Sequence, residues 1–251
     1  MKPLYFIIAN LSFALLASGC SVGSSTPVQG DIRDPYETQN RRVHEFNRKI
    51  DTKFFRNFDD SDKTSSAAVE GLKNNVSNVA DTVSIPGEVV NQILQGQLGS
   101  AAANTLRFAV NATFGLGGLD DVASDLMIAQ YDTDFGETLH VWGVGEGAYL
   151  ELPLLGPSTE RDAVGQVVDL FTNPLTYVLD TPARVAMTGV KVADKSFDRE
   201  KYGETLDSVL YDSADSYTQI KLIYVQARRF ELGVEPEIAD DDPYALDTSG
   251  F

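Results

Sequence analysis

Apolar side chains recur every three or four residues along much of the chain, which is the spacing of one face of an α-helix. Such spacing of apolar residues is found over 101–114 and 215–232, among other segments. No internal repeat of fixed length is visible. The pattern therefore predicts an all-α fold in a single domain. Its clearest example is a narrow apolar seam on a polar segment, formed by Val69, Leu72, Val76, Val79 and Val83.

Residues with strong capping preferences mark the predicted helix ends. Asp34 followed by Pro35 and Glu37 is the fullest start signal, because Asp accepts backbone N–H bonds at an N-cap and Pro fits the first turn. Pro86 predicts that a second, short helix begins after the apolar seam. The predicted starts are at Asp34, Pro86, Ser100, Thr159, Thr181 and Asp215, and the predicted stops are at Gly96, Asn173 and Gly233.

Residues 131–157 lack a helical period and are expected to be irregular. Gly143, Gly145 and Gly147 alternate with other residues there, which leaves room for a short hairpin. Pro153 argues against a central strand, because proline cannot donate a ladder hydrogen bond.

The 251 residues include 20 Lys and Arg against 37 Asp and Glu, a formal net charge of −17. This acid excess argues against nucleic acid as a partner, because binding phosphates requires a surplus of positive charge. Residues 234–251 are acidic and contain proline, so we expect a disordered tail after a helical domain over 34–233.

The N-terminal segment has the features of a targeting signal. Lys2 precedes an apolar run that is too short and too interrupted to indicate a membrane span but fits a secretory signal. The run ends in Leu-Ala-Ser-Gly before Cys20, the only cysteine, which resembles a bacterial lipobox apart from Ala17, where Leu is preferred. This predicts a signal peptide over 1–19, lipid attachment at Cys20 and a flexible acylated tether over 20–33. The alternative is an ordinary signal peptide with an incidental cysteine.

The residues required for enzymatic chemistry do not assemble into a recognisable pattern. The glycines at 143–147 lack GxGxxG spacing, and His44 and His140, the only histidines, show no metal-ligand or nucleophile pattern. The aspartates at 120–121 and 240–242 lack EF-hand spacing. We therefore predict a non-enzymatic protein with no cofactor and no metal.

Several stretches, in order and covering roughly 34–232, resemble the MlaA (VacJ) family of outer-membrane lipoproteins. They are 34–37 (Asp-Pro-Tyr-Glu), Asn40-Arg41, Phe46-Asn47, 94–96 (Leu-Gln-Gly), Arg107-Phe108 with Asn111, 115–120 (Gly-Leu-Gly-Gly-Leu-Asp), 134–139, 143–153, Gly156 and Arg161-Asp162.

This resemblance implies a ring- or disc-shaped helical protein in the inner leaflet of the outer membrane, anchored through Cys20 on the periplasmic side. Such a protein removes mislocalised phospholipids from the outer leaflet through a central channel and so maintains lipid asymmetry. The implied partners are membrane phospholipid, a trimeric outer-membrane porin and a soluble periplasmic lipid carrier. The alternative is a structural lipoprotein that docks porins or envelope proteins without moving lipid.

In this setting the nearly uncharged helix over 101–114 supplies the candidate site residues. Asn104, Arg107 and Asn111 share one stripe and are candidates for channel or headgroup contact, since a guanidinium forms paired bonds with phosphate. The alternative for Arg107 is a structural ion pair with an Asp or Glu. An Arg107→Glu variant that lost clearance at normal abundance would favour the first interpretation, and loss of the protein the second.

The glycine-rich segment that follows this helix is a candidate gate or hinge, and equally a candidate tight turn between helices. The glycines concerned are Gly115, Gly117 and Gly118.

Overall fold

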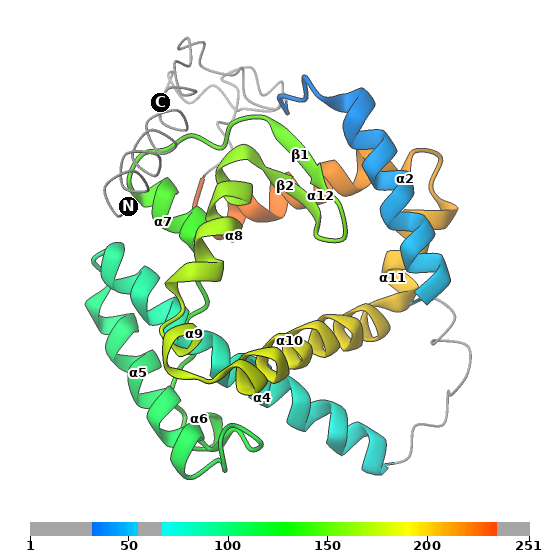
Figure 1. Cartoon of the computed structure of the whole chain (residues 1–251). Helices are drawn as coiled ribbons and strands as arrows, with labels where there is room; N and C mark the ends of the chain where they lie inside the picture. The colour runs from blue at the N-terminus through cyan, green and yellow to red at the C-terminus, as the bar shows by residue number, and fades with distance from the viewer. Residues whose placement is uncertain (1–31, 55–66, 235–251) are drawn as a thin grey trace, which may run out of the picture. The chain divides into compact units, whose positions relative to one another are not determined.

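The computed structural model describes residues 32–54 and 67–234 (Figure 1). The predicted signal peptide, Cys20, almost all of the tether and the acidic tail from 235 onward lie outside the described residues. The residues described belong to one unit, which spans Ile32–Pro236.

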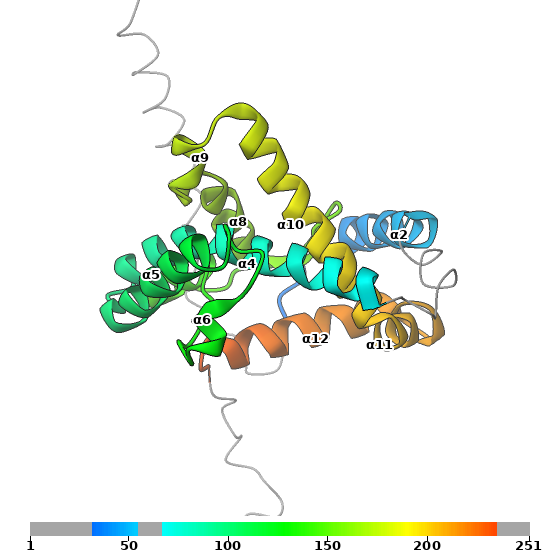
Figure 2. The same cartoon turned by 90° about the horizontal axis from the view of Figure 1, so that it is seen from below.

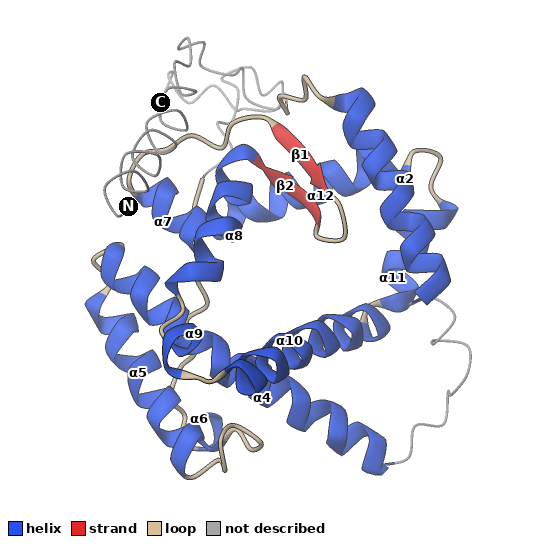
Figure 3. Ribbon diagram, in the orientation of Figure 1, coloured by secondary structure: helices blue, strands red, loops and turns tan. Residues whose placement is uncertain are grey.

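Helices make up most of this unit, so the all-α prediction is confirmed (Figure 3). The only strands among the described residues form a two-stranded antiparallel sheet. The α-helices are α2 (Glu37–Phe54), α4 (Ala67–Leu94), α5 (Leu98–Thr113), α6 (Val122–Asp125), α7 (Phe135–Val141), α8 (Glu160–Thr172), α9 (Leu175–Val178), α10 (Thr181–Lys201), α11 (Gly203–Asp207) and α12 (Ser216–Glu231). The remaining elements are the strands β1 (Tyr149–Leu152) and β2 (Gly156–Thr159) and the π-helical turn η1 (Ser208–Asp212).

Most predicted helix ends lie where the capping residues indicated. Thr159 caps α8 by accepting a hydrogen bond from the N–H of Asp162, and Asp215 caps α12 in the same way. Gly233, at a positive φ of 65°, follows the end of α12. Three starts are shifted. Helix α2 begins at Glu37 rather than directly after Asp34, whose carboxylate accepts from the side chains of Tyr217 and Lys221. Helix α5 begins at Leu98 rather than after Ser100, and Asp180 rather than Thr181 accepts the capping bond of α10.

The prediction of a separate helix starting at Pro86 is wrong. Pro86 lies inside α4, which runs without interruption for 28 residues. Proline removes one backbone donor from a helix, but its fixed φ is itself helical. Asn173 supports the helix beside the proline, because its Nδ2 donates to the carbonyl of Val83 at 2.8 Å. Packing of α4 against α5 and α10 thus outweighs the local preference of proline to start a helix.

The segment 131–157 is more ordered than expected. The hairpin is present, with Pro153 in the turn between β1 and β2. Helix α7, however, was not predicted. Asp134 caps it by accepting a hydrogen bond from the N–H of Glu137 at 2.7 Å, so the Asp134 and Glu137 spacing was the overlooked signal.

Two asparagines of α2 hold strand β1 against the helix. Asn40 donates to the carbonyl of Tyr149 at 3.1 Å and accepts from the N–H of Glu151 at 3.0 Å. Asn47, two helical turns further on, bonds in the same manner to the Leu152 carbonyl at 3.0 Å and the Leu154 N–H at 2.8 Å. Each side-chain amide therefore bonds to the hairpin as a backbone peptide group would.

Within this unit, α2, the hairpin, α8, α10 and α12 are arranged around a central opening (Figure 1). Seen from below, α2, α4 and α5 lie at a similar level, with α12 on one side of them and α9 on the other (Figure 2). None of the helices in the described part of the chain is long and apolar enough to cross a membrane.

Candidate functional site

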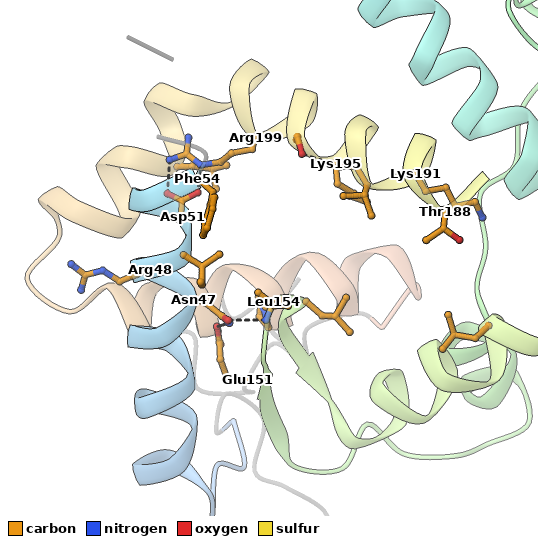
Figure 4. Close-up of a pocket in the computed structure, with 18 of the residues that line it drawn as sticks. Asn47, Arg48, Asp51, Phe54, Glu151, Leu154, Thr188, Lys191, Lys195 and Arg199 are labelled. Atoms are coloured by element: carbon orange, nitrogen blue, oxygen red, sulfur yellow. Dashed lines mark hydrogen bonds and ion pairs between the residues drawn. The ribbon is translucent and has the colours of Figure 1, made fainter. Parts of the chain in front are cut away.

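The opening contains a cavity of about 1270 Å³ (Figure 4). Its walls come from α2, the hairpin, α8, α9, α10, α11, η1 and α12, so elements from most of the described chain contribute to it. Apolar side chains cover much of the wall, and they are Ile50, Phe54, Leu154, Leu155, Leu170, Met187, Val192, Leu206, Leu210 and Ile220.

Helix α10 contributes a row of cations to one side of this cavity. Arg184, Lys191, Lys195 and Arg199 are spaced by seven, four and four residues, which places them on one helical face. Figure 4 shows Lys191, Lys195 and Arg199 following one another along α10, with Leu154 on the far side of the cavity. The cavity therefore has a cationic wall, which we call the α10 wall, opposite apolar side chains of the hairpin.

Helix α2 and the α10 wall meet in an ion-pair cluster at one end of the cavity. Arg199 donates to both carboxylate oxygens of Asp51, at 2.7 and 2.8 Å, and to Asp207 at 2.6 Å. These bonds raise the pKa of Arg199 above its ordinary value, even though burial opposes the rise. The positive charge of Arg199 is therefore already paired with the carboxylates of Asp51 and Asp207.

The three candidate residues of α5 lie away from this cavity, and none is among the described residues that line it. All three are buried. Arg107 forms an ion pair with Asp121 at 2.5 Å and donates to the Ile128 carbonyl at 2.7 Å. Asn104 donates to the Tyr131 carbonyl at 2.8 Å, and Asn111 donates to Asp121 at 2.9 Å.

These contacts anchor the loop and short helix that follow α5. The ion pair expected under the alternative interpretation of Arg107 is present. Contact of Asn104, Arg107 or Asn111 with a lipid headgroup stays a prediction.

The glycine-rich segment after α5 forms a hydrogen-bonded turn. Gly117 and Gly118 have positive φ values of 80° and 93°, and the N–H of Gly118 donates to the Asn111 carbonyl at 3.0 Å. A Cβ on Gly118 would lie 2.6 Å from Thr82 Oγ1, and one on Gly115 would lie 2.2 Å from the Asp120 carbonyl oxygen. Gly118 therefore permits close packing against α4 and Gly115 permits close approach within the turn, while movement of the turn as a gate stays a prediction.

Sequence reasoning missed the α10 wall. Its signal was a set of basic residues at helical spacing in a strongly acidic chain, between 184 and 199. The pattern alone does not show that this face lines a cavity, because that depends on how α2, the hairpin and α12 close around it.

Many large apolar side chains are exposed on the described surface. Phe114 is 76% exposed, Val178 80% and Met127 94%. Others lie on α5, α7, α8 and α9 or beside them, and they include Leu98, Leu106, Leu116, Leu126, Trp142, Val164, Val167, Phe171 and Tyr177. Exposed apolar surface on this scale is typical of proteins that contact a membrane or another protein.

Comparison with known proteins identifies the family. The family model described as MlaA lipoprotein matches residues 32–231. The chain is 31% identical over 199 residues to an uncharacterized protein of Rickettsia bellii, covering 79% of this chain and 76% of that protein. It is also 31% identical to the intermembrane phospholipid transport system lipoprotein MlaA of Escherichia coli, covering 86% of this chain and 84% of that protein.

A solved structure supports the same conclusion. It is described as the structural basis for maintenance of bacterial outer membrane lipid asymmetry, and it matches with a TM-score of 0.61 and 27% sequence identity. The match covers 79% of this chain and 98% of that structure. The resemblance drawn from the sequence motifs is therefore confirmed, and the chain belongs to the MlaA lipoprotein family.

Proposed function

We propose that this protein removes mislocalised phospholipids from the outer leaflet of the outer membrane, passes them to a periplasmic carrier and thereby maintains lipid asymmetry. The observation that carries the proposal is the central cavity, which combines apolar side chains with a cationic wall. A phospholipid has the complementary chemistry, with apolar chains joined to an anionic phosphate. Membership of the MlaA lipoprotein family supports the same function.

The exposed apolar side chains support a position in one leaflet of the membrane. Apolar surface together with attached acyl chains can hold a protein there, each buried CH₂ contributing about 0.8 kcal/mol. We propose that Cys20 carries those chains, on the periplasmic side of the outer membrane. Replacement of Cys20 by Ala is then expected to leave the precursor uncleaved, and normal maturation of that variant would contradict the assignment.

The proposed partners follow from the path of the lipid. A trimeric porin beside the protein would give the assembly a fixed place in the outer membrane, and a soluble carrier would accept lipid on the periplasmic side. Headgroup contact by Asn104, Arg107 and Asn111, and gating by Gly115, Gly117 and Gly118, belong to the same proposal. Their observed contacts support a role in shaping the loop beside α5.

The proposal is tested by measuring outer-leaflet phospholipid in a deletion strain with and without complementation. We expect surface phospholipid to accumulate on deletion and to return to normal with the wild-type gene. Met187→Trp, which fills part of the cavity, should fail to restore it, whereas Gln226→Trp, at an exposed position of α12 outside the cavity lining, should succeed. Unchanged surface phospholipid after deletion would instead favour a structural lipoprotein that docks porins.

A further inference from the structure

The cations that line the cavity differ in how far their charge is already satisfied. Arg199 bonds to two carboxylates, and Arg48 lies over the Tyr211 ring, with its guanidinium carbon 5.3 Å from the ring centroid. Arg184 is exposed and donates to Thr181 at 3.0 Å. Arg199 and Arg48 therefore already interact with groups of the protein, and the charge of Arg184 is solvated.

Lys191 is different. Its side chain is half-buried in the cavity wall, and no carboxylate among the described residues lies within 4.0 Å of its ammonium group. Burial lowers the pKa of Lys191, while Glu88 and Asp169 act in the opposite direction from a greater distance. An ammonium has three donors, so this position offers strong hydrogen-bonding capacity that the protein does not use.

The two carboxyl groups that raise the pKa of Lys191, those of Asp169 and Glu88, have other hydrogen-bond partners. Asp169 accepts from Asn91 at 2.9 Å through one oxygen and from the N–H of Phe135 at 2.9 Å through the other. Glu88 accepts a hydrogen bond from Asn104 at 3.3 Å, and burial, reinforced by Asp132 and Asp81, raises its pKa to about 8, which weakens its effect as a counter-charge to Lys191. The ammonium thus lacks a full counter-charge from the protein.

We propose that Lys191 binds the phosphate of the phospholipid headgroup, with the acyl chains directed toward Leu154 and Leu155 of the hairpin. This inference rests on the proposed function and specifies how the lipid is oriented inside the cavity. A lysine binds phosphate as a compact point charge, and a partly desolvated site strengthens that attraction. Because a bound phosphate would supply the missing counter-charge, lipid binding should also favour the protonated form of Lys191.

The test measures binding to the purified full-length lipoprotein by titration calorimetry. The probes are dihexanoyl phosphatidylglycerol, dihexanoylglycerol, which lacks the phosphate, and inorganic phosphate. Lys191→Gln removes the charge at similar size, and Lys191→Arg keeps it. Lys201→Gln is the matched control, because Lys201 lies on the same helix but is exposed and outside the cavity lining. Thermal unfolding establishes that each variant is folded.

We expect Lys191→Gln to weaken binding of the phospholipid by about tenfold or more, the loss associated with one charge-assisted hydrogen bond. Lys191→Arg and Lys201→Gln should bind it nearly as wild type does. Dihexanoylglycerol should bind equally to wild type and Lys191→Gln, because it carries no phosphate.

Other results overturn the inference in distinguishable ways. Equal phospholipid binding by wild type and Lys191→Gln would remove Lys191 from the headgroup site but leave the proposed function standing. Binding of inorganic phosphate as tight as that of the lipid, lost in Lys191→Gln, would identify a free-phosphate site instead. If the wild-type protein bound neither lipid probe, the proposed function would fail and this inference with it.

Discussion

Arg228, near the end of α12, donates through Nη2 to both carboxylate oxygens of Asp134, at 2.6 and 2.7 Å. Asp134 is also the N-cap of α7. One carboxylate therefore starts a helix and joins it to another helix that lies 94 residues away in sequence. The contact adds to the packing of α7 against α8 in holding this seven-residue helix.

Replacement of Asp134 by Ala is expected to lower the free energy of unfolding by about 2 kcal/mol, since both the cap and a partner of Arg228 are lost. Asp134→Asn separates these contributions, because asparagine is also a good N-cap but carries no charge. Urea denaturation of the two variants measures the difference. If both variants matched the wild-type stability, the contact would have no role in fixing α7.

The glycine turn after α5 is expected to respond unequally to added methyl groups. Gly117→Ala should cost about 1 kcal/mol, because its φ of 80° disfavours a Cβ but the space beside it is open. Gly118→Ala should cost more, since its Cβ would also overlap Thr82. The melting temperatures of the two variants test this difference. An equal decrease in both would show that Gly118 does not pack tightly against α4.

Substitution of Arg107 by Gln is expected to destabilise the protein by about 3 kcal/mol, because a buried charged donor is removed from Asp121 and from the Ile128 carbonyl. Arg42→Gln, on the exposed side of α2, is the control and should have little effect. Cellular abundance and urea denaturation measure the result. An Arg107→Gln variant with wild-type stability that failed to clear phospholipid would instead support contact of Arg107 with the lipid headgroup.

Glu88 should make stability depend on pH. Burial first, and then Asp132 and Asp81, raise its pKa from 4.5 to about 8, against opposing effects of Lys191 and Arg107. The folded protein thus keeps a proton that the unfolded chain releases, so the contribution of Glu88 to the free energy of unfolding falls as pH rises from 4.5 to about 8. Glu88→Gln removes this dependence.

Urea denaturation at both ends of that pH window tests the assignment. The stability of Glu88→Gln relative to wild type should increase toward the alkaline end, because only the wild-type protein must ionise or retain a proton there. A difference between the two proteins that stayed constant with pH would show that Glu88 is ionised in the folded protein at neutral pH.

Local signals predicted much of the secondary structure. Thr159, Asp215 and Gly233 act at helix ends through bonds within a few residues, which a sequence shows directly. Pro86 was misread because the stability of α4 depends on packing against α5 and α10 and on a bond from Asn173, none of which the local pattern around Pro86 shows. The same limit applies to the cavity, whose lining runs from His44 to Ile220.

The candidate site shows that limit most clearly. The stripe of Asn104, Arg107 and Asn111 was visible as a helical pattern, but its partners are in the loop after α5. The α10 wall was equally visible as a pattern and became a site only when the fold placed apolar side chains opposite it. Periodicity predicts which residues share a face, whereas the element that covers that face is set by tertiary packing.

The paired asparagines of α2 have a further consequence for how the protein avoids unwanted association. A two-stranded sheet has open edges that can recruit strands from other molecules. Asn40 and Asn47 bond to backbone groups of β1 and of the turn that follows it, so α2 covers that edge much as a third strand would. A chain that carries extensive exposed apolar surface thereby closes one route by which partly folded copies would aggregate.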